Sequence, residues 1–140
     1  MRRSRGFTLI ELLVGMVVLA IITSVALPSY TSYIKRSKVP PGLDALSAYA
    51  TRMEQRYQDT GNYGTSSCAV AFPSTGPANF TLTCSLTNSG QGFQATATGS
   101  DTLSGYVYTI DHNGTRRTTA HPAGVPSAAC WSTKGKVCDA

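Results

Sequence analysis

The pattern of hydrophobic and polar positions is strongest at the start of the chain. Residues 7–27 are apolar almost throughout, and Glu11 is the one charged residue in this run. As an α-helix the run is about 31 Å long at ~1.5 Å per residue, close to the apolar thickness of a bilayer. We therefore predict a transmembrane-type helix over residues 7–27.

A second helix is predicted by a single apolar stripe further along the chain. Its members recur at alternating spacings of three and four: Leu43, Leu46, Ala50, Met53 and Tyr57. This spacing places them on one face of a helix over residues 43–58, which we expect to pack on a sheet. Pro40-Pro41-Gly42 precedes the stripe and predicts a kink or short break near residues 39–42.

In the second half of the chain the alternation changes to period two. Apolar and polar positions alternate over residues 79–86, 92–98 and 105–111, which is typical of half-buried strands. Asn113-Gly114 is a strong hairpin signal that predicts a turn into a fourth segment over residues 115–119.

These elements predict an α+β fold, in which a long N-terminal helix packs on a small antiparallel sheet. The globular part takes residues 28–140, with a loop over 59–78, the sheet over 79–119 and a C-terminal disulfide loop over 120–140.

The cysteines of this globular part favour disulfides. They are Cys68, Cys84, Cys130 and Cys138, with no C-x-x-C pair and no histidine at ligand spacing, so we expect no metal site. An even number of cysteines in a small, loop-rich domain indicates an oxidising compartment. Three connectivities are open, with free thiols as a further alternative. We favour the two sequence-local pairs, Cys68–Cys84 and Cys130–Cys138.

The net charge depends on the first six residues. The formal charge of the whole chain is +5, and Arg2, Arg3 and Arg5 supply three of its basic side chains. Without them, nine basic residues face seven acidic ones, a net charge of +2. Bulk charge therefore says little about partners, although the leading arginines favour a cytoplasmic N-terminus.

Two ordinary explanations of the N-terminal run fit poorly. A secretory signal has a shorter apolar run, with its small-residue cleavage site after the run; here the small residue, Gly6, precedes a longer run. A plain membrane anchor has no use for Glu11, because an acid inside the apolar segment costs roughly 2.5–3.5 kcal/mol on insertion scales. A cationic partner within an assembly would offset that cost.

The apolar run begins with Gly6-Phe7-Thr8-Leu9-Ile10-Glu11-Leu12. This stretch resembles the prepilin motif of type IV pilins and their pseudopilin relatives. The resemblance implies a leader over residues 1–6, cleavage between Gly6 and Phe7, and methylation of the new Phe7 amine. It also implies that Glu11 pairs with the Phe7 amine of a neighbouring subunit during assembly. Pro28 matches a family position where a proline commonly bends or melts the helix.

Three later stretches carry a further resemblance: Met53-Glu54-Gln55-Arg56-Tyr57 with Gly61-Asn62-Tyr63, Tyr108-Thr109-Ile110-Asp111-His112-Asn113-Gly114, and Cys130-Trp131. They are similar to PilE-type pilins, which are often minor subunits. Together with the N-terminal motif, the resemblance covers most of the chain.

No arrangement of residues indicates an enzyme or a cofactor. His112 lies in a predicted turn and His121 beside Pro122, and neither has a nucleophile pattern around it. We therefore expect solvated or capping histidines, no catalytic residues and no cofactor.

The basic residues late in the chain raise the question of DNA. Arg116, Arg117, Lys134 and Lys136 could converge into a stripe that attracts phosphates. The alternative is a solvated strand face and a solvated loop. We keep these four residues as candidate DNA contacts.

The sequence thus predicts a structural subunit that polymerises through its N-terminal helix into a type IV pilus used for adhesion, twitching motility or DNA uptake. Its expected partners are other pilin subunits, prepilin peptidase, the inner-membrane assembly machinery and the membrane. We expect it in the inner membrane before assembly and in an extracellular pilus afterwards. The alternatives are a type II secretion pseudopilin and a membrane-tethered module that binds DNA or another ligand.

Overall fold

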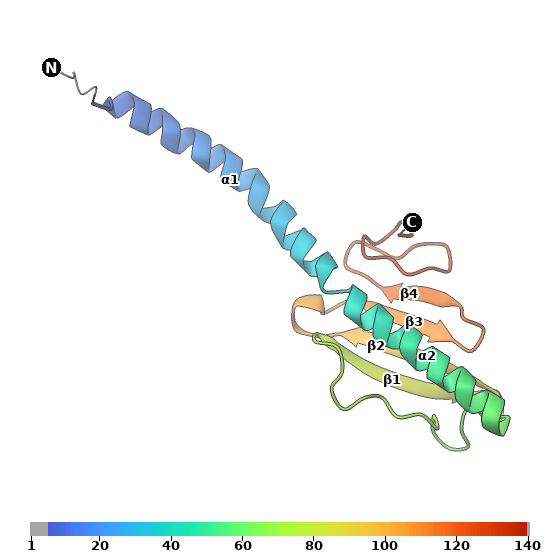
Figure 1. Cartoon of the computed structure of the whole chain (residues 1–140). Helices are drawn as coiled ribbons and strands as arrows, with labels where there is room; N and C mark the ends of the chain where they lie inside the picture. Colours follow the sequence, from blue (N-terminus) through green and yellow to red (C-terminus); the bar gives the residue numbers. More distant parts are fainter. Residues whose placement is uncertain (1–5, 140) are drawn as a thin grey trace. The chain divides into compact units, whose positions relative to one another are not determined.

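The computed structural model describes residues 6–139 of the chain (Figure 1). They divide into two compact units, one that ends at Ile34 and one that begins at Lys35. Arg2, Arg3 and Arg5 of the predicted leader lie outside the described residues.

Helix α1, Leu9–Ser37, is longer than the predicted 7–27 because it continues through Pro28 into a polar stretch. Thr31 Oγ1 and Ser32 Oγ both donate to the Pro28 carbonyl oxygen, at 3.0 and 3.1 Å. These hydroxyls satisfy a backbone acceptor one turn before them. Helix α1 continues through Pro28, so the proline expected to bend or melt the helix does not end it.

Helix α2, Pro40–Thr60, begins three residues earlier than the predicted helix over 43–58. That start was wrong because Pro40 and Pro41 occupy the first helical turn, where a backbone N–H is not needed and the proline φ suits a helix. The same prolines cannot donate to α1, so the predicted break lies at residues 38–39, between the two helices. At the other end Gly61 adopts φ 74° and donates to the Tyr57 carbonyl oxygen.

Within the described residues the strands form one four-stranded antiparallel sheet in the order β1-β2-β3-β4. The strands are β1 (Phe80–Thr87), β2 (Gly92–Gly99), β3 (Val107–Asp111) and β4 (Arg116–Ala120). Strand β3 begins two residues after the predicted 105, because Gly105 has φ +87° and belongs to the preceding turn. The α+β fold is confirmed, and the helix that packs on the sheet is α2 (Figure 1).

The core lies between α2 and one face of the sheet. Leu46 and Met53 of the predicted stripe are fully buried, as is Tyr49, which the stripe did not include. They meet Phe93, Tyr108 and other apolar side chains of β2 and β3 in one cluster. Gly42 is buried as well. A Cβ there would lie 2.5 Å from the Phe80 ring, so a larger residue would not fit at this position. The two prolines thus begin the helix, and the glycine that follows leaves room for the Phe80 ring.

Candidate functional site

Helix α1 presents an apolar surface that its own chain does not cover. None of its residues is buried, and large side chains such as Leu9 and Val25 are 83% and 72% exposed. The helical segment that starts at Leu9 is long and apolar enough to cross a membrane, judged by length and composition. So much exposed apolar surface marks a contact with lipid or with other proteins.

The start of α1 is closed by a reciprocal cap. The Thr8 backbone N–H and the Thr8 hydroxyl both donate to Glu11 Oε2 at 2.9 Å, and the Glu11 N–H donates to Thr8 Oγ1 at 3.3 Å. This capping box satisfies backbone donors that the first helical turn leaves unpaired. Within residues 6–139, the other carboxylate oxygen of Glu11 has no partner. The carboxylate is therefore held in place with one oxygen open to a donor from outside the subunit.

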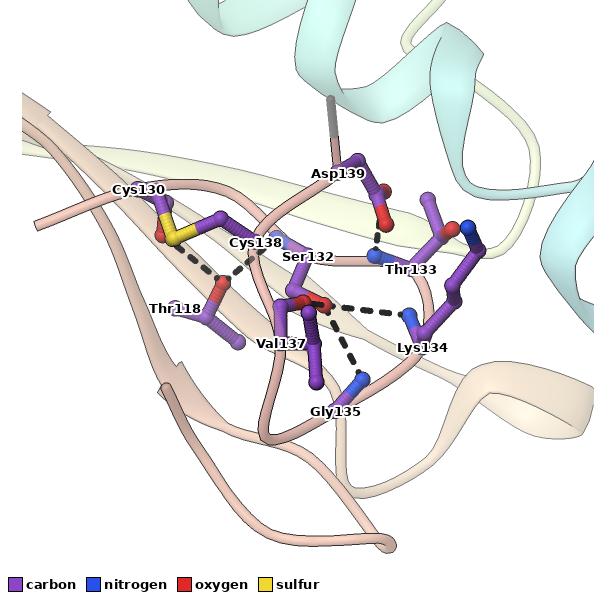
Figure 2. The surroundings of a disulfide bond; sticks show 9 residues. All are labelled: Thr118, Cys130, Ser132, Thr133, Lys134, Gly135, Val137, Cys138 and Asp139. Carbon is purple, nitrogen blue, oxygen red and sulfur yellow. Dashed lines mark hydrogen bonds between the residues drawn. A yellow bond between two sulfur atoms is a disulfide. The ribbon is translucent and has the colours of Figure 1, made fainter. Parts of the chain in front are cut away.

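The second candidate site is the segment between Cys130 and Cys138, called here the disulfide loop (residues 130–138). Figure 2 shows that Ser132 lies at its centre. The Ser132 hydroxyl donates to the Val137 carbonyl oxygen and accepts from the N–H groups of Lys134 and Gly135, at 3.1 and 3.0 Å. Ser132 is fully buried. Its one hydroxyl therefore holds three backbone groups of the loop in position.

Hydrogen bonds also fix the disulfide loop to the sheet. Thr118 Oγ1 donates to the Cys130 carbonyl oxygen at 3.1 Å and accepts from the Ser132 N–H at 2.9 Å. The Tyr108 hydroxyl donates to the Ser132 carbonyl oxygen at 2.9 Å. Burial raises the pKa of the Tyr108 hydroxyl, which therefore keeps its proton for this bond. The loop is thus held on β3 and β4 by buried groups.

Arg116 lies next to this loop and packs on its tryptophan. The Arg116 guanidinium carbon is 4.7 Å from the centre of the Trp131 ring, within the range of a cation–π interaction. The Trp131 indole N–H donates to the Thr109 carbonyl oxygen at 2.9 Å, which fixes the ring. Both side chains line a hollow of about 440 Å³ between the disulfide loop, the β3–β4 hairpin and Leu43 of α2.

The structure brings three of the four predicted basic residues to the region of this loop. Lys134 and Lys136 are exposed within it. The stem of Lys136 runs over Gly124, where an added Cβ would lie 2.8 Å from its Cε. Arg117, by contrast, points to the opposite face of β4 from Arg116, because side chains alternate along a strand. The four side chains therefore do not form one stripe.

Cys68 is joined to Cys84 and Cys130 to Cys138, the two local pairs favoured from the sequence. His112 differs from the expected solvated or capping histidine, because its Nδ1 is buried and has no hydrogen-bond partner among the described residues. His121 Nδ1 accepts from the Ala123 N–H at 3.0 Å, and its Nε2 lies 3.3 Å from the Thr133 carbonyl oxygen, so it ties the disulfide loop to the turn after β4. Across residues 6–139 no group of three or more His, Cys, Asp or Glu side chains could hold a metal ion.

Sequence reasoning missed the roles of Ser132 and Trp131. The Cys130-Trp131 pair was noted only as a family feature, and a serine between two cysteines carries no distinguishing signal. Their partners, Val137, Thr109 and Arg116, are set by how the loop folds onto the sheet.

Two family models match adjoining parts of the chain. Residues 1–27 match the prokaryotic N-terminal methylation motif, and residues 28–107 match the type IV minor pilin ComP, DNA uptake sequence receptor. The second match covers more than half of the chain. It ends before β4, so Arg116, Lys134 and Lys136 lie outside it.

Several curated relatives are fimbrial proteins. The chain is 28% identical to the fimbrial protein EcpC of Eikenella corrodens over 71 residues, which are 51% of this chain and 46% of EcpC. It is 35% identical to the type IV major fimbrial protein FimA of Dichelobacter nodosus over 72 residues, which are 51% of this chain and 42% of that protein. The chain thus spans less than half the length of these relatives.

A solved structure shares the fold. The chain is similar to the non-core minor pilin PilV of Neisseria meningitidis, with a TM-score of 0.55 and 20% identity, over 69% of this chain and 97% of PilV. Identity this low shows the fold alone, and the fold agrees with the sequence matches. From the methylation motif, the match over residues 28–107 and this architecture, the chain belongs to the type IV pilins, in the minor pilin family described as ComP, DNA uptake sequence receptor.

Proposed function

We propose that this chain is a structural subunit that enters a type IV pilus through α1. The single observation that carries the proposal is that α1 is strongly apolar and yet buries none of its residues within its own chain. Lipid covers such a surface before assembly, and helices of neighbouring subunits cover it in a filament. The α2–sheet unit then forms the filament surface.

Glu11 is the residue we assign to placing the incoming subunit. After cleavage between Gly6 and Phe7, the methylated Phe7 amine of a neighbour supplies a positive charge. Glu11 has one carboxylate oxygen that no described residue of its own chain engages. Two charges in a dry bundle of helices satisfy each other, whereas either alone is costly. This role explains why an acid stands in the apolar run over residues 7–27.

The test is Glu11→Ala in cells that make pili. Removing one partner of a buried ion pair costs about 3–5 kcal/mol, so we expect incorporation into sheared filaments to fall about 100-fold or more. Processing and membrane insertion stay normal, because the cleavage site and the apolar run are unchanged. The matched control is Asp59→Ala, an exposed carboxylate near the end of α2, which keeps normal incorporation.

Normal incorporation of the Glu11→Ala chain would refute the assembly role and favour a membrane-tethered module. If the chain enters short secretion-linked filaments and never surface pili, it is a pseudopilin.

A second function, DNA binding, is supported by a specific observation. The side chains of Arg116, Lys134 and Lys136 are exposed, and within the described part of the chain none of them forms an ion pair. Unpaired basic side chains attract phosphates without regard to sequence. The family description, a DNA uptake sequence receptor, points the same way. We propose that the C-terminal region contacts DNA during uptake.

Salt-dependent retention of duplex DNA by the full chain in detergent micelles tests this second function. In Lys134→Gln/Lys136→Gln we expect weaker retention and a salt slope smaller by about two, roughly one per lost phosphate contact. Arg56→Gln is the control, since Arg56 is an exposed basic residue of α2 away from the loop. Equal loss in both variants would make the attraction a property of bulk charge and contradict a localised site.

A further inference from the structure

We infer that Arg116 reads a guanine base in the bound DNA, whereas Lys134 and Lys136 hold phosphates. This inference rests on the DNA binding proposed above. It divides the basic residues into one that recognises sequence and two that supply affinity, and the division follows from how each side chain is held.

The Arg116 guanidinium is positioned by its contact with Trp131. Its guanidinium carbon lies 4.7 Å from the centre of the Trp131 ring. The ring is fixed in turn by its N–H bond of 2.9 Å to the Thr109 carbonyl oxygen. A guanidinium ordered before binding loses less side-chain entropy when a ligand arrives. A flexible surface arginine lacks this advantage.

The donors of this guanidinium remain available. A cation–π contact uses none of the guanidinium's hydrogen-bond donors. Within residues 6–139 these N–H groups have no hydrogen-bond acceptor. The edge of an arginine matches the O6 and N7 acceptors of guanine, the commonest specific contact in the major groove.

The surroundings of Arg116 favour a base over a phosphate. The residues that line the hollow of about 440 Å³ include Arg116, Trp131, Leu43 and Asp139. The Asp139 carboxylate accepts from the Thr133 N–H at 2.7 Å, and its negative charge beside the hollow disfavours a phosphate more than a neutral base. Leu43 and the indole provide apolar walls, which a base edge can contact and a hydrated phosphate avoids.

The lysines are presented differently. Lys134 and Lys136 are exposed on the disulfide loop, and neither ammonium has a partner among the described residues. An ammonium is a strongly hydrated point charge without a preferred plane. It suits a phosphate, whose position varies little with sequence, and it cannot select a base.

The experiment uses the full chain in detergent micelles and a pool of random duplex DNA. Sequencing the retained duplexes of the wild-type chain should show one position enriched in guanine. The enriched duplex is then made with 7-deazaguanine at that position, which removes the N7 acceptor and keeps both base pairing and charge. We expect wild-type retention to weaken roughly 5- to 150-fold with the modified duplex.

The variants separate the two roles. Arg116→Lys should retain both duplexes equally, because a lysine keeps the charge and lacks the paired donors. Trp131→Phe, which keeps a ring face, should preserve part of the guanine preference. Trp131→Leu should abolish the preference with the salt slope unchanged. Lys136→Gln should weaken both duplexes alike and lower the salt slope by about one.

Two results would overturn the inference in distinguishable ways. Salt-dependent retention with no enriched guanine, or with equal retention of the 7-deazaguanine duplex by the wild-type chain, would leave DNA binding in place and reject base reading by Arg116. A wild-type chain that retains no duplex at any salt concentration would reject the proposed DNA binding and this inference with it.

Discussion

The globular unit has two regions that contain a disulfide, and different contacts hold each region in place. The connecting loop, residues 61–79 between α2 and β1, contains no charged residue. It is held by ring contacts: Phe72 stacks on Tyr49 with ring centres 3.8 Å apart, and Tyr63 packs edge-on against Phe93 at 4.9 Å. The disulfide loop contains two lysines and is organised by hydrogen bonds around Ser132.

The difference shows what each bridge stabilises. Cys68–Cys84 holds an apolar layer against β1 and so extends the core that α2 begins. Cys130–Cys138 closes a loop that packs Trp131 against the edge of the core and in addition carries exposed charge. We conclude that the first bridge mainly stabilises the fold. The second mainly stabilises the loop that presents Lys134 and Lys136. The following variants test that division.

The largest effect is expected from Cys68→Ser/Cys84→Ser, which opens a loop with a sequence separation of 16. The free energy of unfolding should fall by about 3 kcal/mol, because the bridge no longer restricts the unfolded chain. Urea unfolding followed by near-ultraviolet circular dichroism measures this loss.

The matched variant is Cys130→Ser/Cys138→Ser, with a separation of 8. Its stability loss should be slightly smaller, and its DNA retention should fall, whereas the first variant retains DNA normally in its folded fraction. If both double variants lost DNA retention equally, the division between the two bridges would fail.

A smaller effect is expected from Ser132→Ala. The change leaves the N–H groups of Lys134 and Gly135 without their acceptor, at a cost of about 2 kcal/mol. Hydrogen exchange should show faster exchange confined to the disulfide loop. Ser127→Ala, an exposed serine before the loop, serves as the control and should change nothing. If exchange became faster throughout the sheet, the disulfide loop would also stabilise the fold, which would contradict the division between the two bridges.

The smallest effect is expected from Tyr49→Phe in the connecting-loop region. It removes the bond of 2.8 Å from the Tyr49 hydroxyl to the Val70 carbonyl oxygen and keeps the stacked ring. The free energy of unfolding should fall by about 1 kcal/mol. DNA retention should equal that of the wild-type chain; a clear decrease would mean that the connecting loop takes part in binding.

Much of the fold could be predicted because local patterns dictate it. The stripe from Leu43 to Tyr57 identified the packed helix, and Asn113-Gly114 identified the last hairpin. The cysteine pairs followed from short separations along the chain. The helix start was missed because Pro40 and Pro41 were taken to interrupt a helix, whereas prolines also begin one.

The candidate DNA site was less predictable, because it depends on contacts between distant residues. Arg116 meets Trp131 only after the disulfide loop folds onto β4. The opposite directions of Arg116 and Arg117 follow from strand alternation, which was already predictable once β4 was recognised. The Ser132 contacts arise from loop geometry and leave no trace in the sequence pattern.

Mass spectrometry of sheared surface filaments tests the central claim, assembly into a pilus, most directly. We expect that this chain is present, that its N-terminal peptide begins at a methylated Phe7, and that non-reducing digestion yields the Cys68–Cys84 and Cys130–Cys138 peptides. A chain absent from the filaments and found wholly in the membrane fraction, with residues 1–6 still attached, would contradict it.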